Sequence, residues 1–192
     1  MKNKIHSPKY QPNNMTGAEL QTLREACHLS RDDLAELVSV EARTLKHWEN
    51  GRSGVPSDVA SAIQKLDDSI NTHALQSIAK IQAAHNMESN SQLDILLIRY
   101  RSAADLRKHM PHLAHMPAAA HGAIAARICT YLRMTPSLQA VKVHIVWMNV
   151  DIYEEWRTAY SLQDSSDTRN AWAAHSLQNQ AIPHRADQPP AA

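Results

Sequence analysis

Apolar residues recur every three or four positions in the N-terminal third of the chain, between residues that start and stop helices. Thr16-Gly17-Ala18-Glu19 has the pattern of a capping box, and Leu20, Leu23 and Ala26 follow it at helical spacing. Ser30 then begins a second helix, because its hydroxyl can accept a hydrogen bond from the backbone at a helix start.

A third helix is predicted from about Glu41 to Glu49, where Leu45 and Trp48 lie three positions apart. Asn50-Gly51 ends this helix, since glycine readily adopts the left-handed backbone found after helix ends. A fourth helix follows a loop that contains proline. The pattern therefore predicts four short helices within residues 16–69.

The rest of the chain mixes helical spacing with two runs typical of β-strands. Residues 70–84 continue as a helix, and the two strand-like runs follow at 93–98 and 141–147. In the second run, Lys142 and His144 share one face, and the other face carries Val141, Val143, Ile145 and Trp147. Further helices are predicted at 102–109, 117–133 and 151–160.

The composition is that of an ordinary globular protein. Hydrophobic residues make up 43% and charged residues 20% of the 192 residues, which excludes wholesale disorder and a large catalytic barrel. Lys and Arg number 20 against 19 Asp and Glu, so net charge points to no class of partner and any electrostatic argument must be local.

Cysteine content and hydropathy indicate a protein of the reducing cytoplasm. Cys27 and Cys129 are too few for a disulfide framework or a thiolate zinc site. No apolar run resembles a secretion signal or reaches the length of about 18 residues that a membrane span requires. We expect Cys27 to be a buried structural residue.

Residues 31–50 carry the pattern of a helix-turn-helix. Two helices that meet at a steep angle need a small residue where they approach, an apolar residue after the turn, and apolar residues that hold the second helix. These roles fall in order to Ala35, Val40, Leu45 and Trp48. The segment resembles the XRE-type regulators related to phage Cro and repressor proteins, through Leu29-Ser30, Leu34-Ala35, Trp48-Glu49-Asn50-Gly51 and Pro56.

Two positions depart from that family pattern. Ser39 stands where the family usually has glycine, so the turn must either hold a serine in a costly backbone conformation or change shape. Glu41 stands where a serine usually caps the helix. Its charge favours the helix dipole but would face DNA phosphates.

The resemblance implies that the helix at 41–49 enters the major groove of DNA. Its positions not used for packing are predicted to read bases, and these are Ala42, Arg43, Lys46 and His47. Arg43 is the first candidate, because its forked donors match guanine O6 and N7, while Ala42 suits a thymine methyl group. The alternative is a solvated basic face, which applies most to His47.

Phosphate contacts are predicted for Arg31, Arg52 and Ser53, which would set the register on DNA. Residues 16–69 hold six basic and ten acidic residues, so the segment is not basic overall. Four of the six basic residues fall on the predicted DNA face. DNA would therefore be attracted by this local cluster of positive charge and not by the net charge of the segment.

A longer stretch of the sequence resembles the YdiL-like branch of this family, which includes anti-CRISPR-associated repressors. It runs from Trp48 to Val59 and is weakly echoed at 153–160. This resemblance implies homodimers on inverted-repeat operators, usually autoregulatory, with RNA binding in some members.

Dimerisation is predicted for the C-terminal half. The helix at 117–133 is rich in alanine, which permits close helix approach, and Ile124, Ile128 and Leu132 form an apolar stripe along it. The same features suit a core within one chain.

Candidate chemistry is sparse elsewhere. Four histidines lie between His109 and His121, but Pro111 and Pro117 break regular spacing, so we expect no metal site and no cofactor. No nucleophile elbow, phosphate loop or dinucleotide fingerprint occurs, and we expect neither a catalytic residue nor an enzyme.

We therefore expect a mainly α protein with an N-terminal helix-turn-helix bundle of four to five helices and a C-terminal α+β domain with a small sheet. The expected layout is a basic arm at 1–15, the bundle at 16–69, a linker helix and loop at 70–92, the α+β domain at 93–178 and a disordered tail at 179–192.

The expected function is a homodimeric, autoregulatory repressor of bacterial or phage type on a palindromic DNA operator. Two alternatives remain open. One is an antitoxin-like or adaptor protein whose C-terminal half binds a protein partner, and the other is a regulator that also binds RNA.

Overall fold

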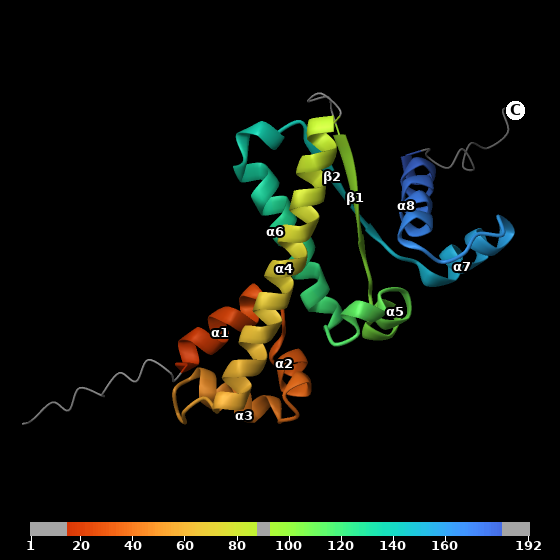
Figure 1. Ribbon diagram of the computed structural model, residues 1–192. Helices are drawn as coiled ribbons and strands as arrows, with labels where there is room; N and C mark the ends of the chain where they lie inside the picture. Colours follow the sequence, from red (N-terminus) through yellow and green to blue (C-terminus); the bar gives the residue numbers. More distant parts are fainter. Residues whose placement is uncertain (1–14, 88–92, 182–192) are drawn as a thin grey trace, which may run out of the picture. The chain divides into compact units, whose positions relative to one another are not determined.

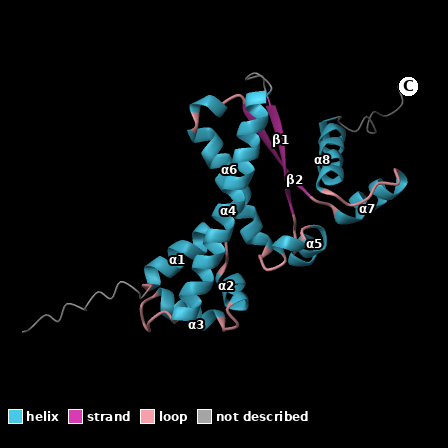
Figure 2. Cartoon of the chain, viewed as in Figure 1, coloured by secondary structure: helices cyan, strands magenta, loops and turns pink. Residues whose placement is uncertain are grey.

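The computed structural model describes residues 15–87 and 93–181. The described chain is mainly helical with one small sheet, as the sequence predicts, and it divides into two compact units, Met1–Ser69 and Ile70–Ala192 (Figures 1 and 2). The basic arm predicted at 1–15 and the tail predicted at 179–192 lie mainly outside the described residues.

The N-terminal unit contains the helices predicted from the capping signals. They are α1 (Gly17–Ala26), α2 (Arg31–Leu37), α3 (Ala42–Glu49) and the first part of α4 (Ser57–Met87). Thr16 and Ser30 each form a complete capping box, the first with Glu19 and the second with Asp33. Their side chains satisfy backbone N–H groups that have no partner within the helix.

The fourth helix is longer than predicted. Residues 57–69 and 70–84 were expected as a short helix and its continuation, and they form one helix of 31 residues, α4, which runs on to Met87. This segment contains no glycine or proline, so nothing in its backbone chemistry ends the helix earlier.

The core of the N-terminal unit comes from aliphatic side chains on all four helices. Leu20, Leu34, Leu45 and Ile63 are completely buried. Cys27 is also completely buried, which confirms its predicted place in the interior. Burying a leucine-sized side chain contributes about 2 kcal/mol, so this small cluster carries much of the stability of the unit.

The C-terminal unit is built around two parallel strands, β1 (Leu93–Arg99) and β2 (Val141–Trp147). Their register pairs Leu93 with Val141 and Arg99 with Trp147. Parallel strands need a long crossover, and here it holds α5 (Ala103–His109), η1 (Pro111–Leu113), α6 (Ala118–Met134) and η2 (Pro136–Leu138). After β2 come α7 (Val150–Ala159) and α8 (Ser166–Ala181), and the sheet packs between α6 and α8 (Figure 1).

The alternation predicted for β2 does not divide the strand into a buried and an exposed face. Val141 is 8% exposed, whereas Ile145 is 50% and Trp147 44% exposed on the face expected to be apolar. Lys142 and His144 are exposed as well. Val146, on the face expected to be polar, is instead only 5% exposed, so the alternation of burial reverses toward the end of β2 and leaves Ile145 and Trp147 facing solvent.

Helix α8 was not among the predicted elements. Ser165 begins it by accepting a hydrogen bond from the Thr168 backbone, and Trp172 and Ala173 bury one side. Few other apolar residues lie along the helix, so its sequence shows only a weak helical pattern.

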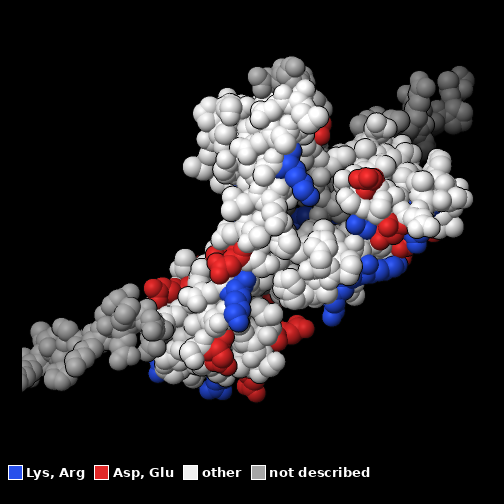
Figure 3. Space-filling view, in the orientation of Figure 1, with Lys and Arg blue, Asp and Glu red and all other residues white. Residues whose placement is uncertain are grey.

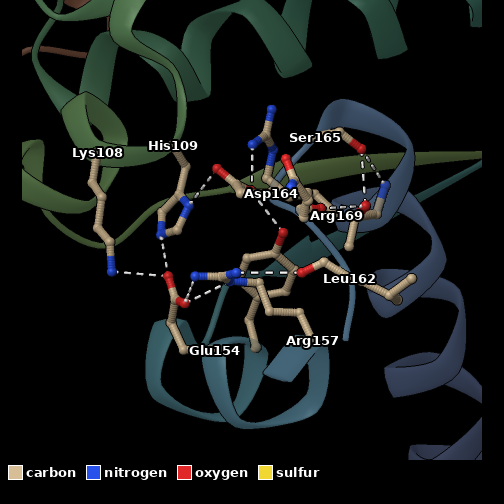
Figure 4. Close-up of polar contacts among 11 residues, drawn as sticks. Lys108, His109, Glu154, Arg157, Leu162, Asp164, Ser165 and Arg169 are labelled. Carbon is tan, nitrogen blue, oxygen red and sulfur yellow. Dashed lines mark hydrogen bonds and ion pairs between the residues drawn. The ribbon is translucent and has the colours of Figure 1, made fainter. Parts of the chain in front are cut away.

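A polar network joins the loop before α8 to the rest of the unit (Figure 4). Tyr153 donates a hydrogen bond to Asp164 at 2.6 Å, Arg169 pairs with the same carboxylate at 2.7 Å, and His109 lies 3.4 Å from it. Burial raises the pKa of Asp164, but these hydrogen bonds and the Arg169 charge outweigh it and leave the pKa below its usual value. The carboxylate is therefore charged and fully engaged at neutral pH.

Candidate nucleic-acid interface

Helix α3 has one buried and one exposed face. Leu45 is completely buried and Trp48 is 9% exposed, so the helix is anchored through the two positions that the sequence assigned to packing. Arg43 and Lys46 lie on the exposed face. Because residues three positions apart share a helix face, these two cations stand next to each other on the outer surface.

Of the two alternatives that the sequence left open at Ser39, the turn before α3 has the strained backbone, with a φ of +56°. The Val40 backbone N–H then donates to the Ala35 carbonyl at 2.9 Å, which brings the chain back against α2. The turn is kept in its usual form with serine in the left-handed region, at a cost of about 1 kcal/mol relative to glycine.

A buried carboxylate fixes the end of α3. Glu49 accepts hydrogen bonds from Arg24 Nε of α1 and Arg31 Nε of α2, each at 2.6 Å, and its side chain is completely buried. Arg24 also donates to the Leu29 carbonyl at 2.8 Å. One carboxylate thus ties all three helices of the predicted motif together.

The charges around Glu49 determine its protonation. Burial acts to raise the pKa of Glu49, but the hydrogen bonds and positive charges of Arg24 and Arg31 outweigh it and bring the pKa below the ordinary value. Glu49 is ionised at neutral pH, as a carboxylate paired with two guanidinium groups requires.

Helix α1 approaches the end of α3 very closely. A Cβ atom at Gly17 would lie 2.1 Å from the Trp48 carbonyl oxygen and 2.6 Å from that of Glu49. Only glycine fits this contact without movement of backbone atoms. The approach fixes the start of α1 against the helix that carries the exposed cations.

The predicted DNA-contacting residues fall into three groups by exposure. Arg43, Lys46, Arg52 and Ser53 are exposed, and Ala42 and His47 are half-buried on the same helix as Arg43. Arg31 differs, because its Nε is bonded to Glu49 and its side chain is 43% exposed. Its position is thus set by the fold, with part of the guanidinium still reaching solvent.

Glu41 is exposed at the start of α3 and makes no side-chain capping hydrogen bond. It therefore adds a negative charge beside the exposed cations without closing the helix end. Figure 3 shows basic and acidic atoms near one another at the edge of the unit where α3 lies.

Comparison with known proteins agrees with this geometry. Residues 16–68 match the family described as a helix-turn-helix domain. These residues form a helix-turn-helix domain.

Two named proteins are similar to part of this chain. A stretch of 53 residues is 42% identical to the Aca2 repressor of Pectobacterium phage ZF40, covering 27% of this chain and 46% of that protein. A stretch of 53 residues is also 40% identical to the antitoxin HigA-2 of Vibrio cholerae, covering 28% of this chain and 50% of that protein. The chain thus matches about half the length of each relative.

Two features of the domain were not predicted from the sequence. Glu49 was recognised only as part of a motif, and Arg24 was assigned no role, although together they form the buried ion pair. The sequence shows only that an arginine and a glutamate lie on two helices of one bundle. Their pairing can be inferred only when the packing of these helices is known.

The residues predicted for dimerisation lie inside the C-terminal unit. Ile124, Ile128 and Leu132 are 7%, 2% and 3% exposed in the single chain, where α6 packs on the sheet and on α4. Their surface is already covered by the core of one chain.

None of the helices in the described residues is long and apolar enough to cross a membrane.

Proposed function

We propose that this chain is a sequence-specific DNA-binding repressor that acts as a homodimer on an inverted-repeat operator near its own gene. The observation that carries the proposal is the exposure of Arg43 and Lys46 on α3, opposite its buried anchors Leu45 and Trp48. In a helix-turn-helix domain that face enters the major groove.

The exposed residues divide the expected contacts into base readout and phosphate binding. Arg43 would read guanine, with Lys46 beside it and Ala42 and His47 at the margin of the contact. Arg52 and Ser53, in the exposed loop after α3, suit phosphates. The repressor named among the relatives supports this assignment, and we assign no catalytic role to any residue.

The homodimer is supported by the sheet of the C-terminal unit. In the described part of the chain the sheet has two parallel strands, and no third strand pairs with the outer edge of β2. Parallel sheets are normally covered on both faces, yet Ile145 and Trp147 are exposed here. Two β2 edges related by a two-fold axis would pair antiparallel and form one continuous sheet, so that side chains on the exposed face, such as Ile145 and Trp147, would pack against those of the partner strand.

An apolar groove of about 600 Å³ lies beside these residues, between α6 and β2. It is lined by Leu132, Cys129 and Val143, and it reaches Ile145. Leu132, which the sequence analysis assigned to the dimer, therefore borders this surface even though its side chain is nearly buried. A second copy would extend the core of one chain across the groove.

Sedimentation and footprinting test the proposal together. We expect the full chain to sediment as a dimer and to protect two half-sites, with centres about 34 Å apart, in DNA upstream of its gene. Ile145→Lys should give a monomer that binds DNA more weakly. The control is Leu75→Lys, because Leu75 is also exposed, at 61%, but lies on α4 and does not line the cavities beside β2. A monomeric wild-type protein would contradict the dimer.

A second candidate function follows from the relative that is named an antitoxin. In that case the groove beside β2 would bind a different protein, and DNA binding would be secondary. Purification from the native host distinguishes the two, since a stoichiometric second protein would favour the antitoxin-like function. Competition between operator DNA and leader RNA tests whether the same basic face also binds RNA.

A further inference from the structure

A cleft of about 380 Å³ opens into the C-terminal unit between α4, β1, α6 and α8. Its inner wall consists of side chains that are almost completely buried, since Tyr100, Leu113 and Ile128 are each 2% exposed. In Figure 3, basic atoms stand at the edge of the hollow between α4 and α8. The volume is within the range of cavities that hold small organic molecules.

The polar side of the cleft is basic. Helix α4 contributes His73, Gln76, Ser77 and Lys80, whose spacing places them on one face of the helix. Arg169 enters the cleft from α8. No carboxylate is found among the described residues that line it, although Arg169 is already paired with Asp164 outside the cleft.

Asp164 compensates the charge of Arg169 from outside the cleft, which leaves Lys80 as the cation to consider. Asp164 accepts hydrogen bonds from Tyr153 and Arg169 and contacts His109, and it does not line the cleft (Figure 4). Lys80 makes no ion pair with any described residue. An anion in the cleft would therefore meet the positive charge of Lys80, which no acidic residue in the described part of the chain compensates.

His121 provides a hydrogen-bonding group at the bottom of the cleft. It is 8% exposed, and its buried Nδ1 atom has no hydrogen-bond partner among the described residues. Burial, together with Arg99, His73 and His112, lowers the pKa of His121 to about 4, so its ring is neutral at pH 7. An unpaired buried polar atom costs about 1–3 kcal/mol, which a ligand group could recover by bonding to it.

We propose that this cleft binds a small organic monocarboxylate, with its apolar body against the inner wall and its carboxylate held by Lys80, His121 and the neighbouring basic groups. The apolar wall favours such a ligand over an inorganic anion, because an inorganic ion would leave that wall uncovered. The site uses no residue of the helix-turn-helix domain, so it is independent of the proposed function.

A metal ion is a poorer occupant than a carboxylate. His73 and His112 are the histidines whose rings come together here, with centroids 6.0 Å apart. Among the described residues, no three side chains of the metal-binding types converge on one position. Zinc needs about four ligands at about 2 Å, which this arrangement does not supply.

Calorimetric titration of the full chain tests the site with benzoate, 1-naphthoate and octanoate, each beside its neutral primary amide. We expect at least one carboxylate to bind with 1:1 stoichiometry and a Kd below about 1 mM, and its amide to bind at least about tenfold more weakly. Absence of binding by all three carboxylates up to about 5 mM, or equal binding of the amide, would overturn the proposal.

Two variants test the role of charge at the cleft. Lys80→Met should weaken carboxylate binding about tenfold, because it keeps the length of the side chain and removes the cation. Lys65→Met is the matched control, since Lys65 is also an exposed lysine of α4 but does not line the cleft. Both residues are exposed, so neither change threatens folding. Equal affinities of the two variants would contradict the assignment.

Histidine ring signals in NMR spectra locate the ligand. The titrated carboxylate should shift the His121 signal and leave His28 unchanged, because His28 is exposed in the N-terminal unit. Binding that leaves the His121 signal in place would put the carboxylate elsewhere on the chain and overturn the proposed site.

Discussion

Arg24 and Glu49, 25 positions apart, form a buried ion pair in which Nε and Oε1 lie 2.6 Å from each other. Arg31 bonds to the second oxygen of the same carboxylate. The buried carboxylate of Glu49 thus positions α3, the helix that carries Arg43. Glu49 is also the glutamate of the Trp-Glu-Asn-Gly sequence by which the motif is recognised.

Replacing Glu49 with glutamine should destabilise the helix-turn-helix domain by about 3 kcal/mol, because two guanidinium groups would then lack a charged partner in the interior. Hydrogen exchange of the Leu45 amide measures the effect as about a hundredfold faster exchange. The control is Glu25→Gln, since Glu25 contacts Arg24 at 3.3 Å with a side chain that is 57% exposed. It should change stability by less than about 1 kcal/mol.

The same ion pair makes the stability of the domain dependent on pH. The pKa of Glu49 is lowered in the folded state from the ordinary value of 4.5. Its stabilising contribution is therefore complete above pH 4.5 and is lost as the pH falls through the folded-state pKa. The protection of the Leu45 amide, after correction for the pH dependence of intrinsic exchange, should decrease in that acidic range in the wild type. If the protection of this amide depended on pH no more steeply in the wild type than in Glu49→Gln, the pH dependence could not be assigned to Glu49.

Gly17→Ala should destabilise the domain by at least about 1 kcal/mol, because the added methyl group would collide with the backbone carbonyls of Trp48 and Glu49. Urea unfolding, monitored by hydrogen exchange of amides in α1 and α3, measures the loss of stability. Gly54→Ala serves as the control, since a Cβ there meets no atom within 4 Å. Equal stability of the two variants would show that the close approach of α1 and α3 is relaxed in solution.

Glu41→Ser should strengthen DNA binding several-fold. The change removes a negative charge next to the DNA-facing cations and supplies a hydroxyl that can cap α3. The gain should shrink as salt is raised, because salt screens the charge. Titration of labelled DNA at two salt concentrations tests this, with Glu25→Ser as the control on α1. Weaker binding by Glu41→Ser would place Glu41 in a favourable contact.

The sequence predicts the helix-turn-helix domain well because its signals are local. Thr16 forms its predicted capping box, Ser30 caps α2 as predicted, and Gly51 adopts a φ of +69° after α3. Ser39 takes the left-handed conformation, one of the two alternatives that the sequence left open. Each signal depends on residues within a few positions of each other. The spacing of Leu45 and Trp48 then indicates which face of α3 is exposed.

Features that depend on distant residues were not predictable in the same way. The parallel pairing of β1 and β2 joins residues about 48 positions apart, such as Leu93 and Val141. Helix α8 is set by the burial of Trp172, which a short polar sequence does not reveal. The basic cleft likewise combines histidines from α4, η1 and α6, which only the folded chain brings together.

The most direct measurement is the affinity of wild-type protein, Arg43→Ala and Lys65→Ala for DNA from immediately upstream of the gene, by gel shift at two salt concentrations. We predict tight, salt-sensitive binding by the wild type and Lys65→Ala, and a loss of about 1–3 kcal/mol in Arg43→Ala. Undiminished binding by Arg43→Ala would contradict the assignment of α3 as the helix that reads the operator.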